Sequence, residues 1–458
     1  MNPTNPYTPP ESLCLDVTTG PPEPVESNEW SAGKRLLLTV GVIILVTLLG
    51  FLEIPLILLG GSVLGGPAYT RTGTTAFLSI GISPIVLAFI LVELFALSIP
   101  TLRQRRLAGA EARAGLRQAS LRLGSLLIFL QSLFHVWELR HNGYIGPEGL
   151  TFFFTAAALA AGSYTLLWLM RLVDRRGLGQ GFSVVLAGVL LSWVLPRPWV
   201  KVPPPAAPPD SPLLGLALVV ILAFLVFQSR PSTVQESFPR SLPLPTSGLQ
   251  PLVLSTLGWG FLASLRQLFQ SETGYSVLSA LKPSSPGSYV VVLALAILFS
   301  ILFNRPSHVR EAWARNSPWP FEELSRHVRR LFWNGLLASA FLMLAGKFLQ
   351  SLLDRQRVAI DVTALAGLAF ISMDLLGEWR FRTTIAPIRT AWELHRVHAV
   401  DPVLAALREA RIPAFPRGFR HRSLMHFFGP MVPVEILVPT EHEAEARSIV
   451  QKLTQPSR

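Results

Sequence analysis

The chain carries few groups that could catalyse a reaction inside its long apolar stretches. Ser183 follows Gly and Phe, but a serine nucleophile needs a base beside it, and no histidine falls in an apolar stretch opposite Ser183. His395 and His398 have the spacing of a metal-ligand pair, yet a solvated helix face explains them better because no further ligands accompany them. The one cysteine, Cys14, excludes an internal disulfide framework and a cysteine-based zinc site. We therefore predict no catalytic residue, no metal and no cofactor, and that the protein is not an enzyme.

Carboxylates within the apolar stretches are the remaining candidates for chemistry. Glu53, Glu93 and Asp374 are of this kind, and such groups are costly in lipid and often functional. We expect Glu93 and Asp374 to lie near the ends of their helices and to face the interior of a helix bundle. A proton-coupled transporter would need a carboxylate near the middle of a span, and Glu93 comes closest. A carboxylate-coupled transporter therefore stays open as an alternative.

The elements that position these groups are predicted to be membrane spans. Half of the 458 residues are apolar and 15% are charged, compared with about 25% charged residues in ordinary soluble domains. The mean hydropathy is +0.43. A bilayer core of about 30 Å is crossed by a helix of about 20 apolar residues. Ten segments satisfy this at least loosely: 36–58, 77–99, 119–137, 151–172, 182–195, 213–227, 251–265, 288–303, 331–349 and 362–377.

The basic residues predict how these spans are oriented. The formal net charge is +12, and most lysines and arginines fall in loops on the same side as the N-terminus. Cytoplasmic loops carry such an excess, so we expect both termini in the cytoplasm. Because this topology explains the basic excess, we expect no direct partner among nucleic acids.

Composition divides the chain into three parts. Residues 1–33 hold several prolines, five carboxylates and no basic residue, which is typical of a disordered tail. Residues 34–385 form the predicted ten-helix domain. Residues 391–458 return to a soluble composition, and the alternation of Val434, Ile436 and Val438 predicts a strand followed by a helix. The fold class is therefore an all-α polytopic membrane protein with a small cytoplasmic α+β domain.

A Gly-x-x-Pro pattern occurs once in each half of the ten-span domain. Gly81 and Pro84 lie in the second segment, and Gly248 and Pro251 lie at the start of the seventh. The equivalent positions favour two inverted repeats of five helices. We expect each proline to bend its helix, because proline interrupts the hydrogen-bond ladder.

Several short motifs in the same order resemble the SecY family, whose members are ten-span channel subunits of the bacterial protein translocase. The resemblance covers about residues 33–385. The motifs are 79–84, 100–102 with the arginine-rich loop after it, 174–183, 242–244, 303–304 and 373–375. The sequence therefore resembles a channel that moves or inserts signal-bearing polypeptides across or into the membrane.

The resemblance implies a constriction lined by a ring of apolar side chains, which excludes ions by dewetting and parts around a passing polypeptide. The tenth span offers Gly367 where a bulky aliphatic residue is expected, so we assign Leu368 by a shift of register. The glycine-rich segment from Gly60 to Gly73 would be the plug on the outer side. Mapped motif by motif, the ring is Val86, Ile90, Phe182, Leu186, Val253 and Leu368.

The resemblance also implies partners, which are small membrane subunits like SecE and SecG, the SecA motor or the ribosome, unfolded or nascent polypeptides, and the lipid bilayer. The loops that dock SecA or the ribosome in the family depart from the family pattern here. Glu93 stands where the family has a glutamine in the second span, near the lateral gate through which apolar helices leave the channel. A non-conducting SecY-like scaffold or regulator therefore stays open as an alternative. The basic residues of the two docking loops are Arg230, Arg240, Arg305, Arg310 and Arg315.

The C-terminal part carries a second resemblance. Residues 412–414 and 434–439 resemble small PII-like signal-transducing domains.

Overall fold

The computed structural model describes most of the predicted spans and most of the C-terminal part. The described residues are 30–52, 54, 76–99, 101–102, 110–141, 145, 149–195, 286–303, 306, 321–355, 362–385, 387–394, 397–424 and 432–454. Several predictions lie outside them: the spans 213–227 and 251–265, the plug segment 60–73, the ring residue Val253, and the loop arginines Arg230, Arg240, Arg305, Arg310 and Arg315.

Eight of the ten predicted spans coincide with described helices. Among the described residues, three stretches are both long and apolar enough to cross a bilayer, namely Ala32–Phe51, Gly115–His141 and Gly149–Arg176. Shorter apolar helices lie at Ser83–Ala96, Gly181–Ser192 and Gly287–Ile301. The full helices are α1 (Ala32–Phe51), α3 (Ser83–Ser98), α5 (Ala110–His141), α6 (Gly149–Arg176), α7 (Gly181–Val194), α11 (Pro286–Phe303), α13 (Phe321–Arg355) and α14 (Val362–Thr384).

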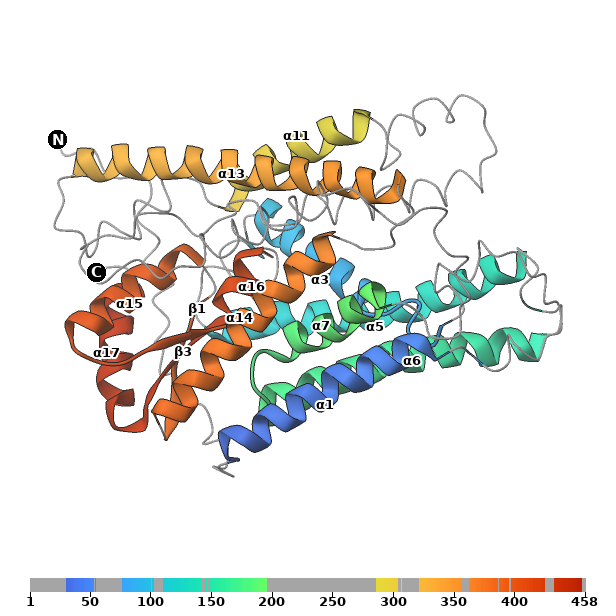
Figure 1. Ribbon diagram of the computed structural model, residues 1–458, viewed down its shortest axis with the longest axis horizontal. Helices are drawn as coiled ribbons and strands as arrows, with labels where there is room; N and C mark the ends of the chain where they lie inside the picture. Colours follow the sequence, from blue (N-terminus) through green and yellow to red (C-terminus); the bar gives the residue numbers. More distant parts are fainter. Residues whose placement is uncertain are drawn as a thin grey trace.

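The outer surface of this bundle is apolar. On α1, Leu37 is 75% exposed and Leu48 is 59% exposed, and Phe153 on α6 is 67% exposed. So many exposed apolar side chains would be unfavourable in water, but they are favourable in contact with lipid tails. In Figure 1, α1 and α6 run side by side along one edge of the molecule.

Helix α7 lies at the centre of the bundle. Its residues from Gly181 to Leu190 are buried without interruption, and it packs against α1, α6 and α14. The close packing on α1 depends on Gly188, because a Cβ there would lie 2.7 Å from the Cβ of Val46. A helix that is apolar on every side is expected to be buried among other helices. This short segment is therefore the core of the described bundle.

The second span differs from the prediction in one respect. We expected a helix over 77–99 bent at Pro84, but α3 begins at Ser83, so that Pro84 lies in its first turn. Proline is well tolerated there because the first N–H groups of a helix have no partner within it. The preceding residues turn instead at Gly81, whose φ is +57°, and the Ser163 hydroxyl donates to the Gly81 carbonyl at 2.8 Å.

A small α+β unit follows α14 and lies beside it at one end of the molecule (Figure 1). Its antiparallel sheet has the order β1-β3-β2. The alternating residues Val434, Ile436 and Val438 are all buried in its core with Val403 and Leu407. Its elements are β1 (Ile388–Leu394), the 3-10 turn Val397–Ala399, α15 (Val400–Glu409), β2 (Phe415–Arg417), α16 (Phe419–Leu424), β3 (Val434–Pro439), the 3-10 turn Thr440–His442 and α17 (Glu443–Thr454).

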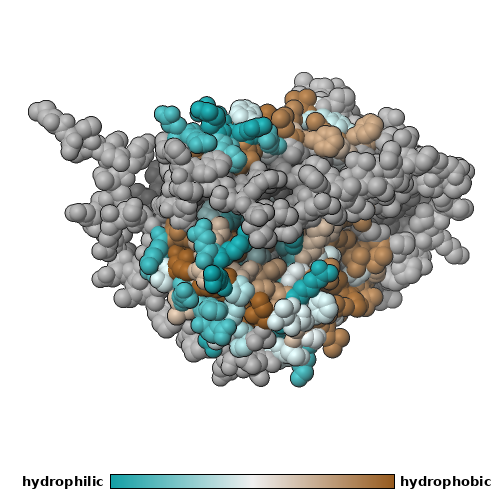
Figure 2. Space-filling model, turned by 60° about the vertical axis from the view of Figure 1, so that its left-hand side comes forward, coloured by the Kyte–Doolittle hydropathy of each residue, from teal (hydrophilic) through white to brown (hydrophobic). Residues whose placement is uncertain are grey.

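Hydrophilic side chains mark the end of the molecule that carries this unit. In Figure 2, which brings that side forward, teal residues form patches on the coloured part of the surface, with brown apolar residues beside them and toward the right. We call residues 388–454 the C-terminal unit. It begins three residues before the boundary of 391 that the composition suggested.

Candidate functional site

Four of the six predicted ring residues meet in one apolar cluster. Phe182 and Leu186 of α7 are buried in the main hydrophobic core, and Val86 of α3 and Leu368 of α14 pack against that core. Ile90 lies elsewhere, because it is buried against Phe299 of α11 in a separate cluster that Val86 also touches. Three helices that are far apart in sequence thus bring aliphatic and aromatic side chains together. The sixth predicted residue, Val253, lies outside the described residues.

Gly367 and Leu368 divide two roles on α14. A Cβ at Gly367 would lie 2.9 Å from Cδ1 of Leu190, so glycine lets α14 approach α7 closely. The next residue, Leu368, supplies an aliphatic side chain to the cluster that contains Phe182 and Leu186. The assignment of Leu368 to the ring by a register shift stays a prediction.

The turn between α6 and α7 fixes where α7 begins. The Thr39 hydroxyl of α1 accepts a hydrogen bond from the Leu178 N–H at 2.8 Å, and the Gly181 N–H donates to Asp174 at 2.6 Å. Gly179 has a φ of +70°, a left-handed conformation that glycine adopts without strain. Its N–H donates to Oε2 of Glu378 on α14 at 2.7 Å. Contacts from three helices therefore hold this turn in place.

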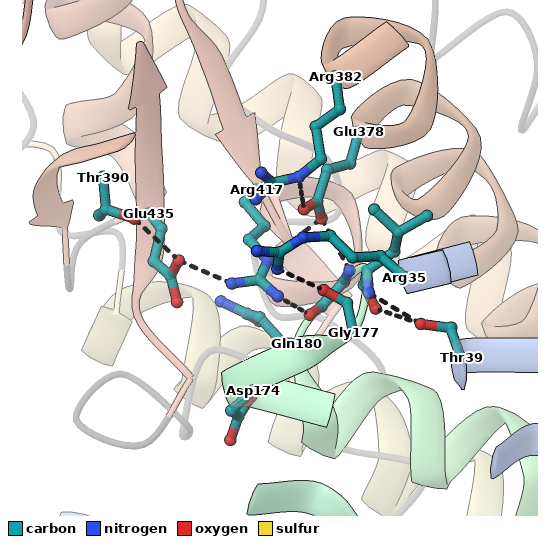
Figure 3. Close-up of polar contacts among 12 residues, drawn as sticks. Arg35, Thr39, Asp174, Gly177, Gln180, Glu378, Arg382, Thr390, Arg417 and Glu435 are labelled. Atoms are coloured by element: carbon teal, nitrogen blue, oxygen red, sulfur yellow. Dashed lines mark hydrogen bonds and ion pairs between the residues drawn. The ribbon is translucent and has the colours of Figure 1, made fainter. Parts of the chain in front are cut away.

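Arg417 of β2 joins the C-terminal unit to this turn. Its Nε lies 3.1 Å from Oε2 of Glu378, its Nη1 lies 2.9 Å from Oε2 of Glu435, and its Nη2 donates to the Gly179 carbonyl. Figure 3 shows the guanidinium between the two carboxylates, with Arg382 reaching the same Glu378. Burial by itself lowers the pKa of Arg417, but the carboxylates of Glu378 and Glu435 outweigh it and raise the pKa above its usual value. Arg417 is therefore a paired, permanently charged group inside the contact.

Helix α16 of the C-terminal unit reaches the first turn of α7. Nδ1 of His421 and Oγ of Ser183 share a hydrogen bond of 2.6 Å, and the His421 ring lies 6.0 Å from the Phe182 ring between centroids. Asp374 of α14 accepts the backbone N–H groups of Arg420 at 3.2 Å and His421 at 2.8 Å. Burial, and then the charge of Arg422, lower the pKa of His421 from 6.5 to about 3, so its imidazole is neutral.

The Ser183–His421 pair does not form a catalytic triad. In a triad a carboxylate orients the histidine ring, but here Asp374 binds the backbone N–H of His421. Nε2 of the ring is buried without a hydrogen-bond partner among the described residues. The pair is therefore a polar contact between two elements, without the geometry that activates a nucleophile.

The remaining polar candidates are placed as follows. Glu93 is 2% exposed on α3, facing inward as expected. Asp374 is also buried, but at a junction with α16 that its sequence context did not indicate. The part of the chain that the structure describes contains no group of three or more potential metal ligands.

Comparison with known families decides what this arrangement belongs to. The SecY family model matches residues 76–316, which is more than half of the chain. The chain belongs to the SecY family. Membership makes it a protein-translocation channel subunit and not an enzyme.

Individual SecY proteins are similar over most of their length. The protein translocase subunit SecY of Escherichia coli strain K12 is 26% identical over 317 residues, which cover 59% of this chain and 70% of the E. coli protein. The SecY subunit of Synechococcus elongatus is 25% identical over 312 residues, with 59% and 70% covered.

Solved structures share the fold. One is of a SecY protein whose plug domain is described as stabilizing the closed state of the channel. It has a TM-score of 0.53 at 14% identity and covers 78% of this chain and 94% of that chain. A second, described as a protein conducting channel, has a TM-score of 0.51 at 15% identity with the same coverage. The SecY fold thus accounts for the ten-helix prediction.

Sequence reasoning missed the residues that attach the C-terminal unit. Glu378, Arg417 and His421 were not singled out, and Gln180, whose side-chain amide donates to the Pro433 carbonyl, was noted only as part of a motif. One signal was present in the sequence. The stretch from Phe415 to Arg422 places four basic residues among aromatic ones, and the acidic Glu378 stands at the end of the last span.

Proposed function

We propose that the chain is the channel subunit through which signal-bearing polypeptides cross, or enter, the inner membrane of a bacterial cell. The observation that carries this proposal is the apolar cluster where α3, α7 and α14 meet, because an apolar constriction seals against ions and yields to any polypeptide sequence. We assign its ring to Val86, Phe182, Leu186 and Leu368, with Ile90 next to Val86 on α3 and with Val253. Both termini face the cytoplasm.

Site-specific photocrosslinking tests the ring. A photoreactive amino acid at Val86 or Leu186 is expected to label a secretory chain stalled in transit, because both side chains belong to the constriction. Leu48, exposed on the outside of α1, is the matched control and is expected to label lipid. Labelling of the stalled chain at Val86 and Leu186 no stronger than at Leu48 contradicts the proposal and favours a non-conducting scaffold.

Partners of this subunit belong to the proposal as well. Small membrane subunits like SecE and SecG complete the channel, and SecA or a ribosome delivers the polypeptide to the arginine-bearing loops around 228–241 and 305–330. Purification of the full chain in mild detergent, with mass spectrometry of small membrane proteins that accompany it, tests the first part. Docking of SecA or a ribosome is tested by substituting Arg310 and Arg315 together by alanine and measuring how tightly each partner binds. Arg389→Ala, in the C-terminal unit, is the control and is expected to bind as the wild type does.

A carboxylate-coupled transporter makes a different prediction. Such a protein would lose solute uptake in the Glu93→Gln variant and would show no crosslink to a polypeptide at Val86. We expect the opposite. Glu93→Gln keeps a buried hydrogen-bonding side chain of similar shape and leaves polypeptide transport intact.

A further inference from the structure

The C-terminal unit contacts the same helices that carry the ring. Arg417 binds Glu378 on α14 and the Gly179 carbonyl in the turn before α7. The side chain of Gln180 in that turn donates to the Pro433 carbonyl just before β3. In Figure 3, Arg417 reaches from the sheet toward Glu378 of α14 and toward the turn that carries Gln180. The contact is therefore made to α7 and α14 rather than to the lipid-facing outside of the bundle.

The contact extends from the turn to the ring itself. His421 lies against both Ser183 and Phe182, and Phe182 is a ring residue. Val432 is 3% exposed and belongs to the same core cluster as Phe182 and Leu186. Side chains of the C-terminal unit thus reach the end of the constriction at which α7 begins.

The side chains at this contact are suited to a specific docked state. His421 and Arg422 are 1% and 2% exposed, and burying polar side chains is costly. The hydrogen bond between Nδ1 of His421 and Oγ of Ser183 offsets part of that cost in the docked state. Gly418 has a φ of +75°, and a Cβ on it would overlap the side-chain amide of Gln180. A backbone turn that fits against one glutamine, beside a charged residue held between two carboxylates, is a shaped contact and not a loose tether.

We propose that the C-terminal unit is a built-in lid that closes the channel at the end where α7 begins and α14 ends, and that it moves away before a polypeptide enters. The inference rests on the proposed channel function and assigns a role to residues 388–454. It places the closing contact at α16 and Val432, next to the first turn of α7.

Chemical accessibility of the ring tests the lid without requiring transport. In full-length chain with Cys14→Ser, a Phe182→Cys substitution is labelled by a maleimide that cannot cross the membrane, added from the side of the C-terminal unit. Adding Arg417→Glu sets a third carboxylate against Glu378 and Glu435 and is expected to speed labelling about a hundredfold, because removing one partner of a buried ion pair is strongly destabilising. Arg389→Glu, at a half-exposed position, is the control. Equal labelling rates in the Arg417 and Arg389 variants overturn the lid.

A reversible crosslink provides the second arm, in case Arg417→Glu fails to fold. Full-length chain with Cys14→Ser, Ser183→Cys and His421→Cys is closed with a short thiol crosslinker that a reductant cleaves. We expect transport of a signal-bearing chain into vesicles to stop on crosslinking and to return on reduction. The control pair is Arg389→Cys with Glu443→Cys, which joins two parts of the C-terminal unit and leaves it free to move.

The outcomes separate the lid from the channel function. Transport that continues through a verified Ser183–His421 crosslink overturns the lid and leaves the channel standing. Absence of transport in the reduced protein, together with faster labelling of the Phe182→Cys variant when Arg417→Glu is added, refutes the channel function and supports a lid over a closed pore.

Discussion

Arg417 shows how much a single residue contributes to the arrangement. Its guanidinium binds the carboxylates of Glu378 and Glu435 and the Gly179 carbonyl. Arg382 also binds Glu378, at 2.7 Å. Arginine is suited to this position because it stays charged when buried and presents several donors in a fixed plane. Lysine could not bridge all three partners at once.

Replacing Arg417 by methionine is expected to weaken the docked state by about 3–5 kcal/mol, since it leaves Glu435 and Glu378 with fewer partners in a buried site. The measurement is hydrogen exchange at amides of β3 and of the turn before α7, which reports local opening. Arg389→Met removes a 3.8 Å ion pair with Glu443 at the surface and should change exchange by less than about 1 kcal/mol. Similar effects of the two substitutions would contradict the role given to Arg417.

His421 gives the contact a dependence on pH. Its pKa is about 3 in the folded protein and near 6.5 when unfolded, so the unfolded chain takes up a proton first as the pH falls. The stability of the docked state is therefore complete above about pH 6.5 and declines between there and about pH 3. Each pH unit in that range costs about 1.4 kcal/mol.

We expect exchange at the amides of α16 to accelerate about tenfold between pH 5.5 and 4.5, after correction for intrinsic exchange, because in that range the undocked imidazole is protonated and the docked one is not. His421→Gln keeps a polar side chain and should remove the effect. His442→Gln, on the surface beside Glu441 and Glu445, is the matched control and should retain it. A pH effect that persists in His421→Gln would assign it to another group.

Part of this site could be predicted from the sequence. The ring positions on α3, α7 and α14 could be assigned from motifs and family resemblance, and that assignment stays a prediction. The Ser183–His421 and Arg417–Glu378 pairs could not, because 238 and 39 residues separate their members and polar pairs leave no periodic pattern in one sequence. Asp374 was expected to face the bundle, and its partners are backbone N–H groups of α16 together with the Arg420 guanidinium.

Among the elements, the turn between α6 and α7 is the most constrained. A Cβ at Gly181 would overlap the carbonyl of Met170, which belongs to the backbone of α6 and cannot rotate away. By contrast, a Cβ at Gly41 in the middle of α1 would meet nothing within 4 Å. The two glycines are therefore present for different reasons.

Gly181→Ala is expected to destabilise the bundle by about 3 kcal/mol, at the upper end of typical overpacking, because α6 and α7 must separate to admit the methyl group. Gly41→Ala should stabilise it by about 0.5–1 kcal/mol, since glycine is unfavourable inside a helix. Thermal unfolding of both variants in the same detergent compares them. The proposed geometry of the turn is wrong if Gly181→Ala unfolds at the wild-type temperature or above.

Element positions followed from the sequence more reliably than element ends. Runs of apolar residues located eight described helices, because length and hydropathy determine a span. The start of α3 was misplaced by six residues, since the hydropathy of residues 77–82 continues that of the helix although Gly81 turns the backbone. The strand of Val434, Ile436 and Val438 could be found because its alternation matches a half-buried strand.

At the scale of the whole molecule, the orientation proposed from basic residues can be tested with the protein's own cysteine. Cys14 should react with an impermeant maleimide in inverted membrane vesicles and be protected in intact spheroplasts, because the tail that carries it lies on the side rich in lysine and arginine. With Cys14→Ser, a cysteine in place of the exposed His141 at the end of α5 should show the reverse pattern. Labelling of both cysteines from one side would refute the topology.

The link between the bundle and the C-terminal unit is short, with three residues between Thr384 at the end of α14 and Ile388 at the start of β1. A group held on so short a tether faces its binding surface at an effective concentration in the millimolar range. A soluble competitor present at micromolar concentration would have to bind the same surface about a thousandfold more tightly to displace it. Displacement is therefore easiest for something that is itself confined to the membrane mouth, such as the polypeptide already waiting there.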